Sequence, residues 1–332
     1  MKRNLINPID VSSILFHTAE DRLGDALIKL PAIIALKNQR PDVRLIWSTG
    51  RKPSVFKRGL APLVTGLIDE IHEISGLGSS WSQIFRSASP HSYDCIIASE
   101  QTLRSTLALR RLSHKMFIAP MANFILSDIR ATANFSQLPV YRQTQTLFEL
   151  AIGELLRLPS TLTLPALYME LAAQLLPVGP EYIGFAPGAG GKEKCWPLNN
   201  YLEIARRQKA HHRVPVFFLG PDEHAWRQAI ATGIPEAIFP EYSASGERLG
   251  GPLLTIALAQ RLRASIANDS GAGHLLAAGG QPLISLFGRT NPRKFEPPFG
   301  SRHVLQPSAF GGTLVTSIPL EEVAQLLANV CG

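Results

Sequence analysis

The first half of the chain alternates short apolar runs with longer stretches in which apolar residues recur at helical spacing. Residues 13–17 predict a buried strand, 20–25 a polar turn, and 26–39 a helix with one apolar face. Strands that alternate with helices in this way are typical of a parallel, doubly wound sheet. Further short strands are predicted over 43–47, 68–74 and 95–98.

The alternation stops between Pro159 and Pro180, where threonine, leucine and proline dominate, and then starts again. The second series predicts another α/β domain. Its strands are predicted over 182–186, 214–219, 264–267 and 282–287, and its helices over 198–209, 253–261 and 274–278.

The predicted domain boundaries follow from this interruption. We expect an N-terminal domain over 1–165, a linker over 166–180 that contains a short helix, and a second domain over 181–316. A C-terminal helix is predicted within 317–332, because its apolar residues share one face and Pro319 stands in the first turn.

Length and composition agree with two folded domains. A chain of 332 residues exceeds what one hydrophobic core usually organises, and 45% of its residues are hydrophobic. Charged residues make up 18%, and 26 glycines and 25 prolines indicate many turns.

The net charge of +7 favours anionic partners, which include phosphorylated substrates, anionic membrane surfaces and nucleic acid. The basic residues form short pairs, such as Arg51-Lys52, without an aromatic RNA-binding motif or zinc-finger spacing. Nucleic acid is therefore the weakest of the three.

The cysteines and the N-terminus indicate a cytoplasmic protein. Cys95, Cys195 and Cys331 are odd in number and far apart, which predicts neither a disulfide framework nor a metal site. The basic N-terminus lacks an apolar signal core, and no apolar run approaches the roughly 18 residues of a membrane span.

The turn over 267–274 follows a predicted strand and opens a predicted helix. Backbone N–H groups and the positive helix end converge there, where a diphosphate could lie. Gly271 and Gly273 permit close approach, and Ser270 and His274 can donate hydrogen bonds. The alternative is an ordinary turn in which Asp269 or Ser270 caps the helix.

A second glycine-rich loop, over 186–197, carries Lys192 and Lys194. It is not a Walker A loop, because Ala186 and Glu193 stand where glycine and a hydroxyl residue are required. The lysines could reach the phosphate groups of a bound substrate, or their side chains could simply be exposed to solvent.

Asp25 follows the first predicted strand, at the edge where ligand sites open in doubly wound sheets. A carboxylate there can take the proton of an attacking hydroxyl, although an aspartate that caps the helix is equally common. No Asp-x-Asp pair occurs, so no metal is expected at a diphosphate. Gly76-Leu77-Gly78 lacks the third glycine of a nicotinamide site.

In order and spacing, these segments resemble glycosyltransferase family 9, the ADP-heptose:lipopolysaccharide heptosyltransferases, over nearly the whole chain. The segments that carry the resemblance are 23–25 with 30–32, 68–71, 187–189 with 194–197, 219–223, 268–271 with His274, and 286–292.

The resemblance implies a GT-B fold, with two Rossmann-like domains that face a central cleft. The first domain would bind the acceptor and the second an ADP-sugar, with no cofactor. Asp25 is implied as the catalytic base, and Arg22 and Gly24 lie at the acceptor. Donor binding is implied for Gly188, Lys194, Glu223, Asp269, Ser270, Gly271, Gly273 and His274.

The chain differs from the family at several positions. A basic residue often stands six positions before the aspartate, but Ala19 occupies that place, with Arg22 nearby as a substitute. The turn 271–274 and the segment 295–298 also depart from the usual family sequence.

The resulting hypothesis is inverting transfer of a heptose-like sugar to a lipid-linked, anionic acceptor of the lipopolysaccharide inner core. The expected location is the cytoplasm, with peripheral contact to the inner membrane surface. Two alternatives remain open: a sugar-nucleotide epimerase, which needs no acceptor, and a non-catalytic nucleotide- or glycan-binding module.

Overall fold

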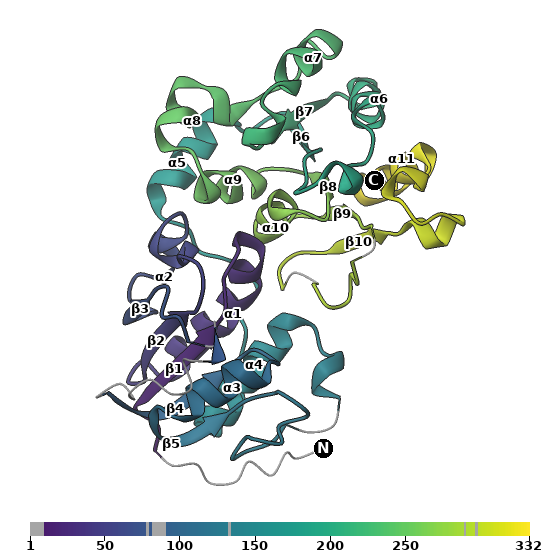
Figure 1. The fold of residues 1–332 in the computed structure, drawn as a ribbon. Helices are drawn as coiled ribbons and strands as arrows, with labels where there is room; N and C mark the ends of the chain where they lie inside the picture. Colours follow the sequence, from purple (N-terminus) through teal and green to yellow (C-terminus); the bar gives the residue numbers. More distant parts are fainter. Residues whose placement is uncertain (1–9, 78–79, 82–90, 132–133, 289, 296–297) are drawn as a thin grey trace. The chain divides into compact units, whose positions relative to one another are not determined.

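The computed structural model describes the chain except residues 1–9, 78–79, 82–90, 132–133, 289 and 296–297, and the side chain of residue 244. It divides into two compact units, Met1–Pro159 and Ser160–Gly332. Each unit contains one five-stranded parallel sheet (Figure 1). The prediction of two doubly wound α/β domains is confirmed.

The first unit has the strand order β3-β2-β1-β4-β5. Register places Ser13 of β1 beside Arg44 of β2, and Ile14 beside Cys95 of β4. The central strands are buried almost throughout, as the apolar runs predicted. The bounds are β1 (Ser13–Thr18), β2 (Arg44–Thr49), β3 (Glu70–His72), β4 (Ser92–Ala98) and β5 (Ser113–Ile118).

Helix α1 (Leu23–Gln39) begins three residues earlier than the sequence predicted and packs against α4 (Val140–Ile152). It is buried all round over residues 26–33, not on one face as predicted. Its N-cap, Arg22, makes no side-chain capping bond, so the sequence carries no cap signal at the true start. Two shorter helices complete the unit: α2 (Ala61–Val64) and α3 (Leu103–Arg110).

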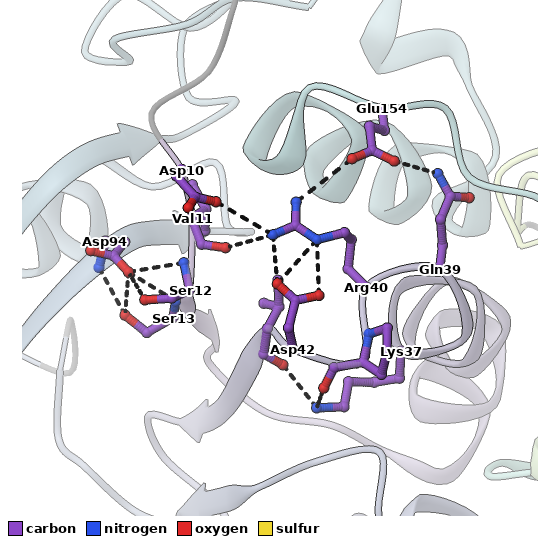
Figure 2. Close-up of polar contacts among 12 residues, drawn as sticks. Asp10, Val11, Ser12, Ser13, Lys37, Gln39, Arg40, Asp42, Asp94 and Glu154 are labelled. Carbon is purple, nitrogen blue, oxygen red and sulfur yellow. Dashed lines mark hydrogen bonds and ion pairs between the residues drawn. The ribbon is translucent and has the colours of Figure 1, made fainter.

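Hydrogen bonds and ion pairs of polar side chains connect the segments at the N-terminal ends of the strands in this sheet (Figure 2). Arg40, just after α1, lies 2.7 Å from Asp42 and 3.6 Å from both Asp10 and Glu154, which ties together three segments. Asp94 of β4 accepts hydrogen bonds from the backbone N–H groups of Ser12 and Ser13, each at 3.0 Å. These contacts lie at the opposite end of β1 from Asp25.

The second unit has the strand order β10-β9-β8-β6-β7. Its bounds are β6 (Glu181–Ala186), β7 (Arg213–Phe217), β8 (Ala264–Asn268), β9 (Leu283–Leu286) and β10 (Arg302–Leu305). The helices are α5 (Ala166–Leu175), α6 (Leu198–Lys209), α7 (Trp226–Gly233), α8 (Ala244–Leu249), α9 (Pro252–Ala259), α10 (Gly271–Ala278) and α11 (Leu320–Cys331).

The stretch 166–180, predicted as a linker, contains α5, which packs on α9 within the second unit. Leu171, Ala172 and Leu176 are buried there, and the division between the units falls earlier, after Pro159. The C-terminal helix α11 buries Val323 and Leu327 in the core of the same unit.

Cys95, Cys195 and Cys331 are free thiols in this structure. Among the helices of the described segments, none combines the length and the apolar character that spanning a membrane requires.

Candidate functional site

The candidate site of the second unit lies at the carboxyl ends of β6 and β8, where the chain passes from one side of the central strand β6 to the other. β6 pairs with β7 on one side and with β8 on the other, so the loops that leave β6 and β8 diverge from neighbouring strand ends. Ligands of open parallel sheets bind at such a switch point, outside the carboxyl ends of the strands. Both glycine-rich segments predicted from the sequence start at this point.

The turn after β8 combines a helix cap with an open helix end. Ser270 is the N-cap of α10, and its hydroxyl accepts the N–H of Gly273 at 3.2 Å. A Cβ at Gly273 would lie 2.7 Å from the carbonyl oxygen of Asn268, so this position requires glycine. The N–H groups of the first turn, from Gly271 and Ala272, have no partner within a helix and are available to an anion.

Asn268 holds the two glycine-rich segments together, a role that its position at the end of a predicted strand does not reveal. Its side chain is 1% exposed, donates to the carbonyl of Pro187 at 2.7 Å and accepts the N–H of Trp196 at 3.0 Å. The indole of Trp196 donates in turn to the carbonyl of Ile318 at 3.0 Å. Both ends of the loop that carries Lys194 are thereby fixed to β8.

A cavity of about 170 Å³ opens beside this helix end, lined by Gly188, Glu223, Ser270 and Gly271 among others. Glu223 is 8% exposed, and burial, together with the charge of Asp222, raises its pKa. The carboxylate fits only because two glycines face it. A Cβ at Gly188 would lie 2.3 Å from its Cδ, and one at Gly220 would lie 2.7 Å from its Oε2.

Two further cavities meet at the same turn. One of about 410 Å³ is lined by Lys194 and Asp269, with Thr290 and Thr313. A much smaller one is lined by Asp269, Ser270, Gly273 and His274, with Arg302 of β10. Every donor-site residue implied by the resemblance therefore lines a cavity at this turn, although His274 and Lys194 line different cavities from Glu223.

Asp269 lines both the Lys194 cavity and the small one, and Ser270 lines both the small one and the Glu223 cavity. Thr290 belongs to the segment 286–292 that carries the resemblance, but it was assigned no role there. Thr313 and Arg302 were not singled out from the sequence, because no local motif marks them.

The first unit has its own switch point between β1 and β4, and Asp25 follows the carboxyl end of β1. Asp25 is half-buried in the first turn of α1, two residues beyond its start. It is not the N-cap, so the capping alternative is wrong for this residue. Gly24 precedes it and is also half-buried.

Arg22 points to the surface. Its side chain is 72% exposed, and its guanidinium lies 3.6 Å from Glu20. Below it lies a buried polar layer made by His17, Asp21 and Lys29. Burial, together with the nearby charge of Lys29, lowers the pKa of His17 to about 4, so this imidazole is neutral at pH 7.

Within the described residues, no three His, Cys, Asp or Glu side chains gather as a metal centre would need. Activity without a metal stays a prediction.

Two units, each with a parallel α/β sheet, are the architecture of GT-B glycosyltransferases, and solved structures of that class share this fold. A glycosyltransferase family 9 protein from Veillonella parvula has a TM-score of 0.71 at 18% identity, over 98% of this chain and 99% of that one. An Escherichia coli heptosyltransferase solved with ADP-2-deoxy-2-fluoro heptose has a TM-score of 0.66 at 18% identity, over 96% and 99%.

The sequence model of glycosyltransferase family 9 (heptosyltransferase) matches residues 81–308, which is more than half of the chain. The protein therefore belongs to glycosyltransferase family 9. Arg289, in one of the segments that carry the resemblance, lies outside the described residues. Gly78 and residues 296–297, which belong to other motifs of the sequence analysis, also lie outside them.

Curated relatives match over a shorter stretch. Lipopolysaccharide heptosyltransferase 2 of Salmonella typhimurium is 32% identical over 125 residues, 36% of this chain and 34% of that protein. Lipopolysaccharide heptosyltransferase 1 of Pseudomonas aeruginosa is 36% identical over 118 residues, 34% of this chain and 30% of that protein. The match spans about a third of the length of these relatives.

Proposed function

We propose that this protein transfers a heptose-like sugar from an ADP-sugar to an acceptor of the lipopolysaccharide inner core, with inversion. The observation that carries the proposal is the group of cavities around the β8–α10 turn. The turn carries an open helix end, Lys194 lines one of the cavities around it, and the buried carboxylate of Glu223 lines another. Helix N–H groups and lysine complement a diphosphate, and a carboxylate suits the hydroxyls of a ribose.

The choice of ADP-heptose is supported by the names of similar proteins. A fold relative was solved with ADP-2-deoxy-2-fluoro heptose, and the curated relatives are lipopolysaccharide heptosyltransferases. The net charge of +7 suits an anionic, lipid-linked acceptor and contact with an anionic membrane surface.

The chemistry assigned to Asp25 is general-base catalysis. The acceptor hydroxyl oxygen forms a bond to the anomeric carbon while the bond from that carbon to the diphosphate oxygen breaks. Asp25 takes the hydroxyl proton, and ADP leaves with the electron pair of the broken bond. Lys194 and the N–H groups of α10 then stabilise the charge that develops on ADP, without a metal.

A transfer assay with the whole chain tests this proposal. The protein is incubated with ADP-heptose and with lipopolysaccharide from a strain that lacks inner-core heptose. Expected products are ADP and an acceptor heavier by one heptose. Isomerisation of the donor, or ADP release that is independent of acceptor, would favour an epimerase-type activity. Donor binding without turnover on any inner-core acceptor would favour a binding module.

The nucleotide base is tested separately by thermal unfolding, because a ligand that binds only the native state raises its melting temperature. ADP-, UDP- and GDP-sugars are compared at equal concentration. ADP-sugars are expected to stabilise most, and a larger shift with UDP- or GDP-sugars would contradict the assignment.

A further inference from the structure

The segment just before α11 forms one wall of the largest of the three cavities at the β8–α10 turn. This cavity measures about 410 Å³, within the roughly 300–1,000 Å³ of small-molecule sites. Its described lining residues, all in the second unit, are Glu193, Lys194, Asp269, Gly288, Thr290, Thr313, Leu314 and Val315. The segment 313–315 lies beyond the residues that the family model matches, and the resemblance assigned it no role.

Buried residues hold this wall in place. Val315 is fully buried and Ile318 is 1% exposed, both in the core of the second unit. The indole of Trp196 donates to the carbonyl of Ile318 at 3.0 Å. Gly312 packs so closely on Ser317 that a Cβ at Gly312 would lie 2.2 Å from the Cβ of Ser317. The core therefore fixes the conformation of the wall before a ligand binds, which lowers the entropy lost on binding.

Two exposed side chains stand on this wall, next to the buried Val315. Leu314 is 46% exposed although it is a large apolar residue. Thr313 is also exposed, and its hydroxyl can both donate and accept a hydrogen bond. An apolar side chain beside a hydroxyl suits a sugar, because a sugar ring presents both C–H groups and hydroxyls.

The charges around the cavity indicate which part of a nucleotide-sugar it takes. Among the described lining residues, the carboxyl groups of Glu193 and Asp269 outnumber the ammonium of Lys194. This balance disfavours an anionic diphosphate within the cavity. It suits a neutral sugar, whose hydroxyls can donate to the carboxyl groups and accept from Lys194 and Thr313. The N–H groups at the start of α10 suit the diphosphate better.

We propose that Thr313 binds the transferred sugar of the donor through a hydrogen bond between its hydroxyl and a hydroxyl of the sugar. The inference rests on the proposed function, because it takes the ligand to be a nucleotide-sugar. It assigns the sugar to the 410 Å³ cavity and leaves the nucleotide to the helix end and the Glu223 cavity.

Two substitutions at Thr313 test this assignment. Thr313→Val removes the hydroxyl and keeps the shape of the side chain, while Thr313→Phe places a large ring at the cavity wall. The matched control is Thr316→Val, because Thr316 is exposed in the same segment and does not line this cavity. The dissociation constants of ADP and of ADP-heptose are measured by isothermal titration calorimetry without acceptor. Melting temperatures report whether each variant is folded.

Thr313→Val is expected to raise the dissociation constant of ADP-heptose by roughly 3- to 10-fold, which corresponds to one neutral hydrogen bond. Thr313→Phe should raise it by about 10-fold or more, because the ring takes space that the sugar needs. Both variants should bind ADP within a factor of about two of the wild type, since ADP lacks the sugar. Thr316→Val should bind both ligands as the wild type does.

Two results would overturn the inference. One is that both folded Thr313 variants bind ADP-heptose as tightly as the wild type. The other is an equal loss of affinity for ADP and ADP-heptose, which would place the nucleotide in the cavity. The proposed function can fail separately. A wild-type protein that binds ADP-heptose with this dependence on Thr313, but transfers no heptose to any inner-core acceptor, would contradict the transfer and leave the sugar site standing.

Discussion

Replacement of Gly188 by alanine tests the donor site through a steric effect that the structure defines. The new Cβ would lie 2.3 Å from Cδ, 2.5 Å from Oε1 and 2.7 Å from Oε2 of Glu223. Ordinary contacts of a Cβ exceed 3.4 Å, so the carboxylate must move by about 1 Å. Because it is the far end of a flexible side chain, Glu223 can turn away without unfolding the unit.

The expected loss is that of one hydrogen bond between a charged carboxylate and the nucleotide. Such a bond contributes about 1.5–3 kcal/mol, which corresponds to roughly 10- to 150-fold in the dissociation constant of ADP. The affinity is measured by isothermal titration calorimetry, with the melting temperature recorded for each variant. The matched control is Gly190→Ala, because a Cβ at that position in the same loop meets open space.

A double-mutant cycle connects the effect to Glu223. In a Glu223→Ala background the alanine at 188 has no carboxylate to displace, so the additional loss should disappear. An equal loss for Gly188→Ala in both backgrounds would show that displacement of the Glu223 carboxylate is not the cause of the weaker ADP binding.

Three further predictions concern stability and metal dependence. Asn268→Ala should lower the free energy of unfolding by roughly 2–4 kcal/mol in a denaturant titration, since it leaves the carbonyl of Pro187 and the N–H of Trp196 without their partner. Little change in that titration would contradict the stabilising role of the Asn268 side chain. Burial acts to raise the pKa of Asp94, but hydrogen bonds from Lys115, Ser12 and Ser13 hold it below the ordinary range. Asp94→Asn should therefore be less stable than wild type by about 1.5–3 kcal/mol at neutral pH. The gap should close as pH falls below the ordinary aspartate pKa of about 3.9, because the wild-type contribution is lost as the native carboxylate is protonated. A gap that is constant from pH 7 to pH 2 would rule this out. Treatment with EDTA should leave transfer unchanged, and a loss that Mg²⁺ or Mn²⁺ restores would argue against a site that relies on Lys194 and the helix dipole.

The sequence predicted the buried central strands well because their residues are apolar on both faces. β6 and β8 were placed within one residue at either end. The edge strands β5 and β10 were missed, since Ser113-His114-Lys115 opens the first and the second is only half-buried. Edge strands need fewer apolar residues, so their pattern resembles that of loops.

The site residues could be predicted where a local sequence motif identifies them. They could not be predicted where their role depends on contacts between segments that are distant in the sequence. Gly271, Gly273 and Ser270 stand out in any strand-to-helix turn. Asn268 and Lys29 do not, because a polar residue at a strand end or on a helix usually meets solvent. Only the fold shows that Asn268 bonds to two loops and that Lys29 is buried against Thr18 at the end of β1.

The most direct test of the central claim compares wild type with Asp25→Asn in a single-turnover transfer from ADP-heptose to heptose-free inner-core lipopolysaccharide, with ADP affinity measured on the same preparations. The substitution is expected to lower the transfer rate by roughly 10²- to 10⁴-fold, the contribution of a general base, and to leave ADP affinity within a factor of about two. Transfer by Asp25→Asn at the wild-type rate would contradict the role of Asp25 as the general base.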